Sequence, residues 1–184
     1  MTLNLITPLF RSGMLSKVKE SIPNHPDINW IIVLCSDREI LKKECQDLNL
    51  PFLEINAPDN QGSVHLKVNH AIEHMKPGFF LGIDDDTTFN PNAYELFTRY
   101  KNTHKLIIGE QILKDGSKRP AQKPKHCYTD GAQAMIHSDV IGRLGDFTVD
   151  PVADCNFLLS AWSQCVPEAR IIVNEVMSNY NFLR

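Results

Sequence analysis

Strand-sized apolar runs alternate with amphipathic helical patterns through the first 90 residues of this chain, and this alternation is the strongest constraint on its fold. The run INWIIVL at 28–34 is apolar nearly throughout, as is typical of a strand in a parallel sheet that is covered on both faces. The segment 63–75 has apolar residues at helical spacing, and a Lys-Pro-Gly sequence ends it. Alternating strands and helices predict βαβ units and therefore an α/β fold, with a mostly parallel central sheet flanked by helices.

The composition is that of an ordinary globular protein, and it argues against several functional classes. The chain has 184 residues, a length that fits one domain, and its formal net charge of -3 gives no indication of nucleic-acid binding. No apolar stretch is long enough to span a membrane, and the first residues lack the pattern of a signal peptide, so a cytoplasmic location is expected. The five cysteines have no short Cys-x-x-Cys spacing, which favours free thiols.

Three consecutive carboxylates end the fourth apolar run, in the sequence GFFLGIDDDTTF at 78–89. Ligands of open parallel sheets bind beyond the carboxyl ends of the strands, where this triplet is expected to lie. In an extended chain Asp84 and Asp86 point to one side and Asp85 to the other. Two like charges 4 Å apart repel each other by about 1 kcal/mol in water, and a divalent cation removes that cost. Because carboxylate oxygens suit Mn²⁺ or Mg²⁺, Asp84 and Asp86 are predicted metal ligands, with a solvated acidic turn as the alternative.

Several short motifs follow one another in the order found in the GT-A fold of nucleotide-sugar glycosyltransferases, and the chain resembles that family. IDDDTTFNP at 83–91 resembles its D-x-D segment, and LITPLFR at 5–11 resembles its first strand and the turn beside the nucleobase. INWIIVLCSD at 28–37 looks like the second strand of the animal glucuronosyltransferases. GRLGDF at 142–147 and VADCNFLLSAW at 152–162 resemble acceptor-side segments of the family-2 enzymes.

The resemblance implies one GT-A domain over residues 1–184, with a nucleotide-binding half at 1–90 and an acceptor-side half at 91–184. It also implies the reaction, a metal-dependent transfer of a sugar from a nucleotide-diphosphate donor to a hydroxyl of a glycan or other acceptor. The expected donor is a UDP-sugar, and the expected outcome is inversion at the anomeric carbon. A homo-oligomer is a further expectation, because so short a chain offers little surface for an acceptor.

The same resemblance assigns roles to individual residues. Asp154 falls at the position of the general base that deprotonates the acceptor hydroxyl. Asp86, together with Asp84, would hold the Mn²⁺ or Mg²⁺ on the diphosphate, where the metal acts as a Lewis acid. The nucleotide-binding residues that the resemblance implies are Thr7, Pro8, Leu9, Arg11, Asp37, Lys67, Asn69, Asp84 and Asp85.

Some positions depart from the family pattern, and alternatives stay open there. Cys35 and Ser36 occupy the place of an acidic residue that reads the base, and Asp37 is the nearest substitute. Asn69 alone represents a helix motif that normally includes an arginine, so Lys67 is expected to supply the charge toward the phosphates.

Two further positions have competing assignments. Asp146 and Asp150 compete with Asp154 for the role of general base. Asp154 is preferred because it begins a predicted helix, where the helix dipole favours a carboxylate, although N-capping alone would also explain it. Asn174 or Glu175 stands where the family often has a metal-binding histidine.

Other residues with binding chemistry have simpler explanations. His70 and His74 are four apart on one predicted helix but do not form the H-E-x-x-H motif, and an exposed helix face is the preferred interpretation. Asp130 and Gly131 fit a substrate-binding turn and a plain turn equally well. The basic segment 114–125 is expected to be a loop, either a lid over the diphosphate or ordinary surface.

Two other functions remain open. A sugar-nucleotide nucleotidyltransferase would have a glycine-rich loop with Arg and Lys after the first strand, and TPLFRSG has one Gly and one Arg. A non-catalytic module that binds a nucleotide or a sugar is favoured by the short second half. Release of pyrophosphate would identify the nucleotidyltransferase, and release of free UDP the transferase.

Overall fold

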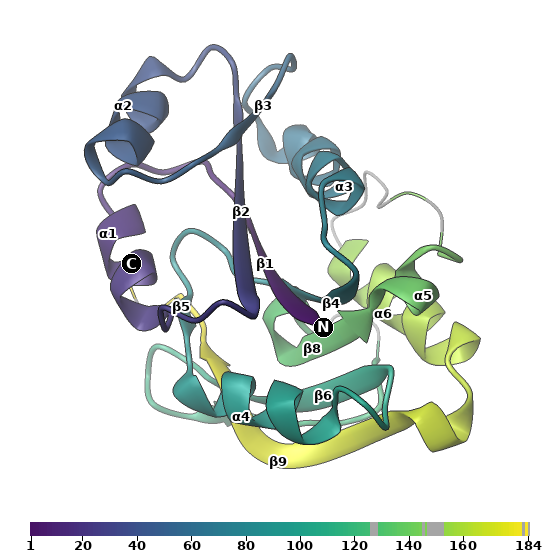
Figure 1. Ribbon diagram of the computed structural model, residues 1–184. Helices are drawn as coiled ribbons and strands as arrows, with labels where there is room; N and C mark the ends of the chain where they lie inside the picture. Colours follow the sequence, from purple (N-terminus) through teal and green to yellow (C-terminus); the bar gives the residue numbers. More distant parts are fainter. Residues whose placement is uncertain (126–128, 145, 147–152, 182, 184) are drawn as a thin grey trace.

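The computed structural model describes residues 1–125, 129–144, 146, 153–181 and 183, and its strands join into one sheet with helices on both faces (Figure 1). The order along the sheet is β3-β2-β1-β4-β8-β6-β9-β5, and β7 pairs with β6 beside this path. The α/β class and the central sheet predicted from the sequence are confirmed.

The first half of the sheet is the parallel array that the alternating pattern predicts. It consists of β1 (Thr2–Pro8), β2 (Ile28–Cys35), β3 (Leu53–Ile55) and β4 (Gly78–Gly82). The pairings of β1 with β2, β1 with β4 and β2 with β3 are all parallel. Nearly every residue of β1 and β4 is buried, as expected for central strands covered on both faces.

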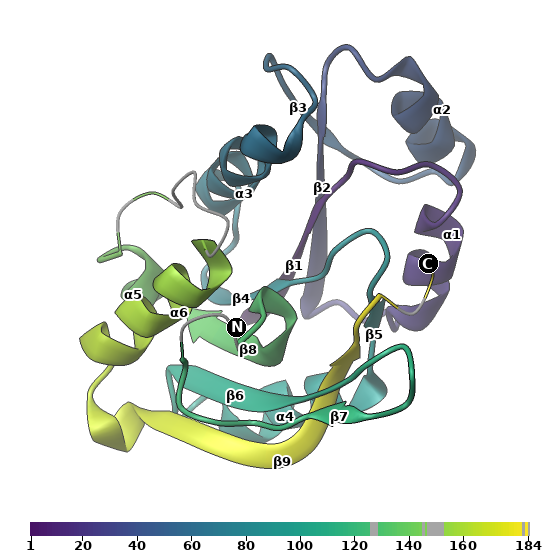
Figure 2. The same cartoon turned by 180° about the vertical axis from the view of Figure 1, so that it is seen from behind.

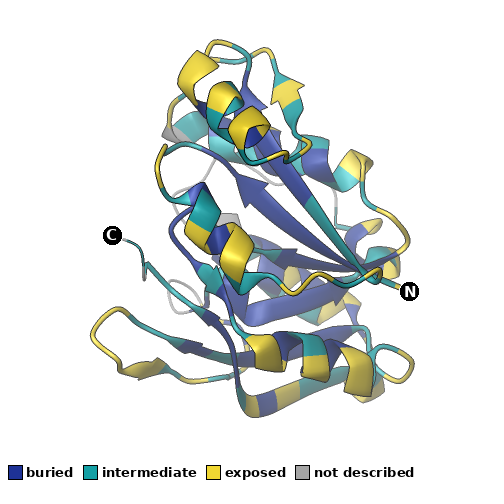
Figure 3. Cartoon of the chain, turned by 60° about the vertical axis from the view of Figure 1, so that its left-hand side comes forward, coloured by how far each residue is buried: buried dark blue, intermediate teal, exposed yellow. Residues whose placement is uncertain are grey.

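Helices cover both faces of the sheet, which Figure 2 shows from behind. Ile6 of β1 packs in the same cluster as Val68 of α3 (Val64–Glu73), with α5 (Ser138–Ile141) and α6 (Ala153–Gln164) on the same face. The opposite face packs against α1 (Leu15–Ser21), α2 (Glu39–Asp47) and α4 (Pro91–Tyr100). Figure 3 shows the buried strands between these two layers of helices, whose outer faces are exposed.

The second half adds antiparallel strands, so the complete sheet is mixed. β8 (Ala134–His137) pairs antiparallel with both β4 and β6 (Leu106–Ile112). β7 (Lys118–Arg119) forms a hairpin with β6 inside the basic segment that was expected to be a loop. Short 3-10 helices precede α3, β8 and β9, at η1 (Gln61–Ser63), η2 (Gly131–Gln133) and η3 (Pro167–Ala169).

The last strand is longer than its apolar run predicts. The sequence indicates a strand at 170–173, whereas β9 spans Arg170–Asn179 and runs parallel to β6. A shift of register near Glu110 lets β9 continue along β6 beyond the apolar run. Its far end pairs with β5 (Thr88–Phe89), which only Thr87 separates from the acidic triplet and which was not predicted. This pairing brings the end of β9 close to the acidic triplet.

The thiols that the structure describes are buried and free, at Cys35, Cys45, Cys155 and Cys165, while Cys127 lies outside the described residues. Burial raises the pKa of the Cys45 thiol to about 11, which makes it a poor nucleophile. Among the described residues, no helix has the length and apolar character that a membrane crossing requires.

Candidate functional site

The turn after β1 and the acidic triplet after β4 lie side by side at one edge of the sheet. β1 and β4 are parallel neighbours, with Ile6 opposite Gly82, so their carboxyl ends meet there. The amide of Ile83 donates a hydrogen bond to the Ile6 carbonyl at 2.8 Å, and the Thr7 hydroxyl donates to the Ile83 carbonyl at 2.7 Å. The triplet therefore occupies the edge at which open parallel sheets bind their ligands.

Asp85 is fully buried and holds the main chain of the turn after β1. Its Oδ2 accepts hydrogen bonds from the amides of Phe10 and Arg11, at 2.7 and 2.8 Å. Its Oδ1 accepts from Nε of Arg11 at 2.7 Å and also pairs with Nη2 of Arg11. The resemblance included Asp85 among the nucleotide-binding residues, whereas in the structure both oxygens of its carboxylate bind groups of the protein itself.

Asp86 is also buried, and donors from both ends of the chain surround it. Nη1 of Arg11 lies 2.9 Å from its Oδ2. The side-chain amide of Asn181, oriented to satisfy its hydrogen bonds, donates to the same carboxylate at 2.8 and 3.2 Å. The neighbouring Thr87 hydroxyl is buried and has no hydrogen-bond partner within the part of the chain that the structure describes. The amide of Asn181 had no signal in the sequence, because it is 95 residues from Asp86.

Arg11 is the cation that Asp85 and Asp86 share, and its side chain remains 34% exposed. Burial alone would lower the pKa of Arg11, but the hydrogen bond to Asp85 and the charges of the acidic triplet raise it above its usual value. The guanidinium therefore stays charged. Its charge offsets part of the repulsion among the three carboxylates. The sequence alone had suggested that a metal ion removes this repulsion.

A buried lysine supports the turn after β1 from the other side. Lys67 of α3 is fully buried, and its Nζ donates to the Leu9 carbonyl and to Oδ1 of Asp59, both at 2.7 Å. The same ammonium lies 3.2 Å from the centre of the Phe10 ring. Burial lowers the pKa of Lys67, and the pairing with Asp59 opposes that shift. In this position Lys67 orders the turn after β1. The sequence had predicted instead that Lys67 supplies positive charge toward the phosphates.

Arg38 and Asp59 complete this support, and sequence reasoning missed both. Arg38 pairs with Oδ2 of Asp59, and its Nη2 donates to the Phe10 carbonyl at 3.2 Å. Each backbone polar group from the Leu9 carbonyl to the Arg11 amide consequently has a charged side-chain partner. Neither residue lies in a recognisable motif, so no local pattern could have identified them.

A small pocket opens beside Asp84, the half-buried member of the triplet. Asp84 lines it together with Asp130 and Gly131 of the η2 turn, and Pro8 of β1 adds to the same wall. Its remaining lining is largely apolar and comes from β1, β4, α3, α6 and η2: Ile6, Val64, Val68, Phe80, Gly82, Ala132, Phe157 and Leu158. An apolar pocket with a few convergent carboxylates is typical of a small-molecule site.

Asp130 is held in a fixed orientation at this pocket. Its Oδ1 accepts hydrogen bonds from the Ala132 amide at 2.9 Å and from Nε2 of Gln111 at 3.3 Å. Nη1 of Arg119, from the hairpin strand β7, lies 3.4 Å from its Oδ2. The basic segment predicted as a loop therefore contributes one of its charges to Asp130, which lines the pocket.

The structure separates other predicted residues from this pocket. Asp37 is exposed in the turn after β2. Asn69 lines a different groove, between α3 and α5, together with Asp146. Glu175, one of two residues near the position of the family's metal-binding histidine, pairs with Arg99 of α4 at 2.6 Å.

The remaining predicted residues divide between the core and the undescribed part of the chain. Thr7 is buried and accepts a hydrogen bond from the Trp30 indole at 2.9 Å, and Leu9 is fully buried in the core. Position 154 belongs to the first turn of α6, but its side chain lies outside the described part of the structure, as does all of Asp150.

Asp85→Asn is expected to lower the free energy of unfolding by about 2–3 kcal/mol. The amide has nearly the same shape, but it removes the charge that faces Arg11 and turns N–H donors toward the donors of the turn. Urea denaturation measures the effect. Asp47→Asn is the matched control, because Asp47 is exposed and its ion pair with Lys43 is worth little. Equal midpoints for the two variants would contradict the role given to Asp85.

Comparisons with known proteins identify the fold but no sequence family. No protein-family model matches the chain, and no curated protein matches it either. The structure of the TarS 1-349 fragment from S. aureus in complex with UDP superposes with a TM-score of 0.73 at 15% identity, covering 97% of this chain and 60% of that one. The complex of the same fragment with UDP-GlcNAc gives 0.71 at 15% identity, covering 97% and 58%.

A longer TarS structure gives a TM-score of 0.70 at 13% identity, covering 97% of this chain and 36% of that one. The chain therefore has the fold predicted from the motif resemblance, and it spans about 60% or less of each TarS chain.

Proposed function

We propose that this chain is a nucleotide-sugar glycosyltransferase that uses a divalent metal ion and transfers a sugar from a UDP-sugar to a hydroxyl of a glycan or other acceptor, with inversion. The observation that carries the proposal is the convergence of the β1 turn and the acidic triplet at the ligand-binding edge of the sheet. The fold is shared with a protein solved with UDP and with UDP-GlcNAc, which supports this choice of donor. A cytoplasmic location and self-association remain predictions from the sequence.

The acidic residues have different tasks in this proposal. Asp84 lines the pocket and accepts hydrogen bonds from the ribose hydroxyls. Asp86, together with Asp84, would hold Mn²⁺ or Mg²⁺, and the buried hydroxyl of Thr87 fits such an ion because hydroxyl and carboxylate oxygens are hard ligands. A bound dication would supply Lewis-acid stabilisation of the departing diphosphate. Asp85 positions the β1 turn.

The remaining steps belong to groups of this chain. The guanidinium of Arg11, one-third exposed beside Asp86, supplies positive charge toward the diphosphate. The carboxylate of Asp154 takes the proton from the acceptor hydroxyl, so that the oxygen can attack the anomeric carbon opposite the leaving UDP. Position 154 lies one turn before Leu158, which lines the Asp84 pocket, and this proximity supports the choice of Asp154 as the base.

UDP is expected to bind only weakly without metal and to raise the melting temperature in the presence of Mn²⁺, and Asp86→Asn is expected to remove that shift. Isothermal titration of UDP with and without Mn²⁺, together with thermal unfolding, measures both effects. Asp47→Asn is the control, since it makes the same change at an exposed surface carboxylate. Metal-independent UDP binding that Asp86→Asn leaves unchanged would reject the metal site.

A further inference from the structure

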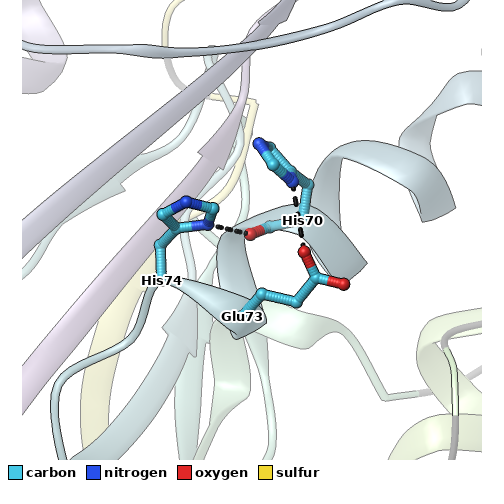
Figure 4. Close-up of side chains that lie close together, drawn as sticks. All are labelled: His70, Glu73 and His74. Atoms are coloured by element: carbon cyan, nitrogen blue, oxygen red, sulfur yellow. Dashed lines mark hydrogen bonds and ion pairs between the residues drawn. The ribbon is translucent and has the colours of Figure 1, made fainter.

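A second cluster of metal-binding chemistry lies at the C-terminal end of α3. His70, Glu73 and His74 each offer one ligand atom, and these atoms lie within 4.8 Å of one another. Their positions, i, i+3 and i+4, place them on one face of the helix. Figure 4 shows the two imidazoles and the carboxylate together at the end of the helix. Among the described residues, no other group of three or more His, Cys, Asp or Glu side chains has ligand atoms that lie so close together.

Hydrogen bonds fix which ring nitrogens carry protons. Nδ1 of His74 lies 2.8 Å from the main-chain carbonyl of His70, which can only accept, so Nδ1 is the donor. Nδ1 of His70 lies 3.3 Å from a carboxylate oxygen of Glu73 and donates to it in the same way. In this arrangement Nε2 of His74 keeps its lone pair, and a backbone carbonyl on the other nitrogen is the usual outer partner of a metal-binding histidine. The contact between His70 and Glu73 is given up when the Glu73 carboxylate itself becomes a metal ligand.

The cluster is accessible and separate from the proposed donor site. The side chains of His70 and Glu73 are 31% and 70% exposed, and His74 is exposed as well. His74 precedes β4 and Asp84 follows it, so the cluster and the acidic triplet lie at opposite ends of that strand. The buried residues of α3, including Lys67 and Val68, face the sheet instead.

We propose that His70, Glu73 and His74 form a binding site for a zinc ion. Two imidazole nitrogens and one carboxylate oxygen are the ligands that zinc prefers, whereas Mg²⁺ and Mn²⁺ prefer sites made of oxygen. Zinc ligands stand about 3.4 Å apart in tetrahedral coordination at bond lengths near 2.1 Å, and rotation of these exposed side chains closes the remaining gap. The C-terminal end of a helix carries partial negative charge, which also favours a cation.

A zinc ion at this position links three side chains in the last turn of α3. Three protein ligands leave one tetrahedral position for water or for a group from another molecule. The chain is therefore expected to bind one zinc ion at this site and to melt at a higher temperature with it, because the ion binds the folded helix and not the unfolded chain.

The test is an isothermal titration of the tag-free full chain with zinc chloride, in a buffer that does not chelate metals. His70→Ala and His74→Ala are each expected to weaken zinc binding by at least about tenfold, and Glu73→Gln to weaken it less. His65→Ala is the matched control on the same helix, and it is expected to bind zinc as the unaltered chain does. Circular dichroism verifies that each variant is folded.

A spectroscopic measurement separates this site from the proposed donor site. Co²⁺ bound in place of zinc is expected to give visible absorption bands of tetrahedral type, which His70→Ala removes and Asp86→Asn leaves intact. Zinc binding that survives in the double variant His70→Ala/His74→Ala, or bands that depend on Asp86, would overturn the proposal. Absence of binding to the unaltered chain would overturn it as well.

Discussion

Lys67→Met is expected to lower the free energy of unfolding by about 3–5 kcal/mol. Methionine fills a similar volume, so the loss comes from the groups that the ammonium leaves behind. The Leu9 carbonyl loses its charged donor, and Asp59 keeps Arg38 as a partner but loses a buried one. Removing one member of a buried ion pair is costly, because the remaining charge is no longer compensated. Urea denaturation gives the midpoint and the slope.

Lys43→Met is the control for this substitution. Lys43 pairs with Asp47 at 3.2 Å, but both side chains are mostly exposed, so its replacement is expected to change stability by less than about 0.5 kcal/mol. A midpoint for Lys67→Met that equals the midpoint for Lys43→Met would refute the supporting role of Lys67. A large loss of stability with unchanged UDP affinity in the folded fraction would show that the lysine does not order the turn for the nucleotide.

Asp154→Asn is expected to slow sugar transfer by about 10²–10⁴-fold, the usual contribution of a general base. Transfer to water, which releases free UDP from a UDP-sugar, provides an assay without a known acceptor. UDP affinity is expected to stay unchanged, because the base acts on the acceptor and not on the nucleotide. Kinetic analysis with a panel of UDP-sugars in the presence of Mn²⁺ separates the two quantities.

The competing carboxylates supply the controls for that experiment. Asp146→Asn and Asp150→Asn are expected to retain transfer, and a selective loss in either would move the base to that position. Asp146 lines the separate groove beside Asn69, which makes it the less suitable base. Pyrophosphate as the product would favour the nucleotidyltransferase, and the absence of any turnover would favour a binding module.

The parallel half of the sheet could be predicted because its signals are local. An apolar run of seven residues, or a helical stripe ended by Pro and Gly, depends on neighbours in the sequence. The position of the acidic triplet followed from the same reasoning, since it ends an apolar run that becomes β4. The resemblance of the motif order also predicted the fold, which the comparison with TarS confirms.

The partners of the triplet could not be predicted, because they depend on contacts between distant segments. Arg11 is 74 residues from Asp85, and Lys67 is 58 residues from the carbonyl that it binds. A lysine at helical spacing gives no indication that its charge is buried. β5 and the second half of β9 escaped prediction for a related reason, since a two-residue strand and a partly polar one exist only through their pairing.

The return of β9 to β5 makes the two halves of the chain interdependent at the carboxylates. Asn181 contacts Asp86 from the last residues, while Thr2, at the other terminus, begins β1 at the opposite end of the sheet. A fragment limited to 1–90 would lose the amide that Asn181 supplies and the strand that aligns Thr88.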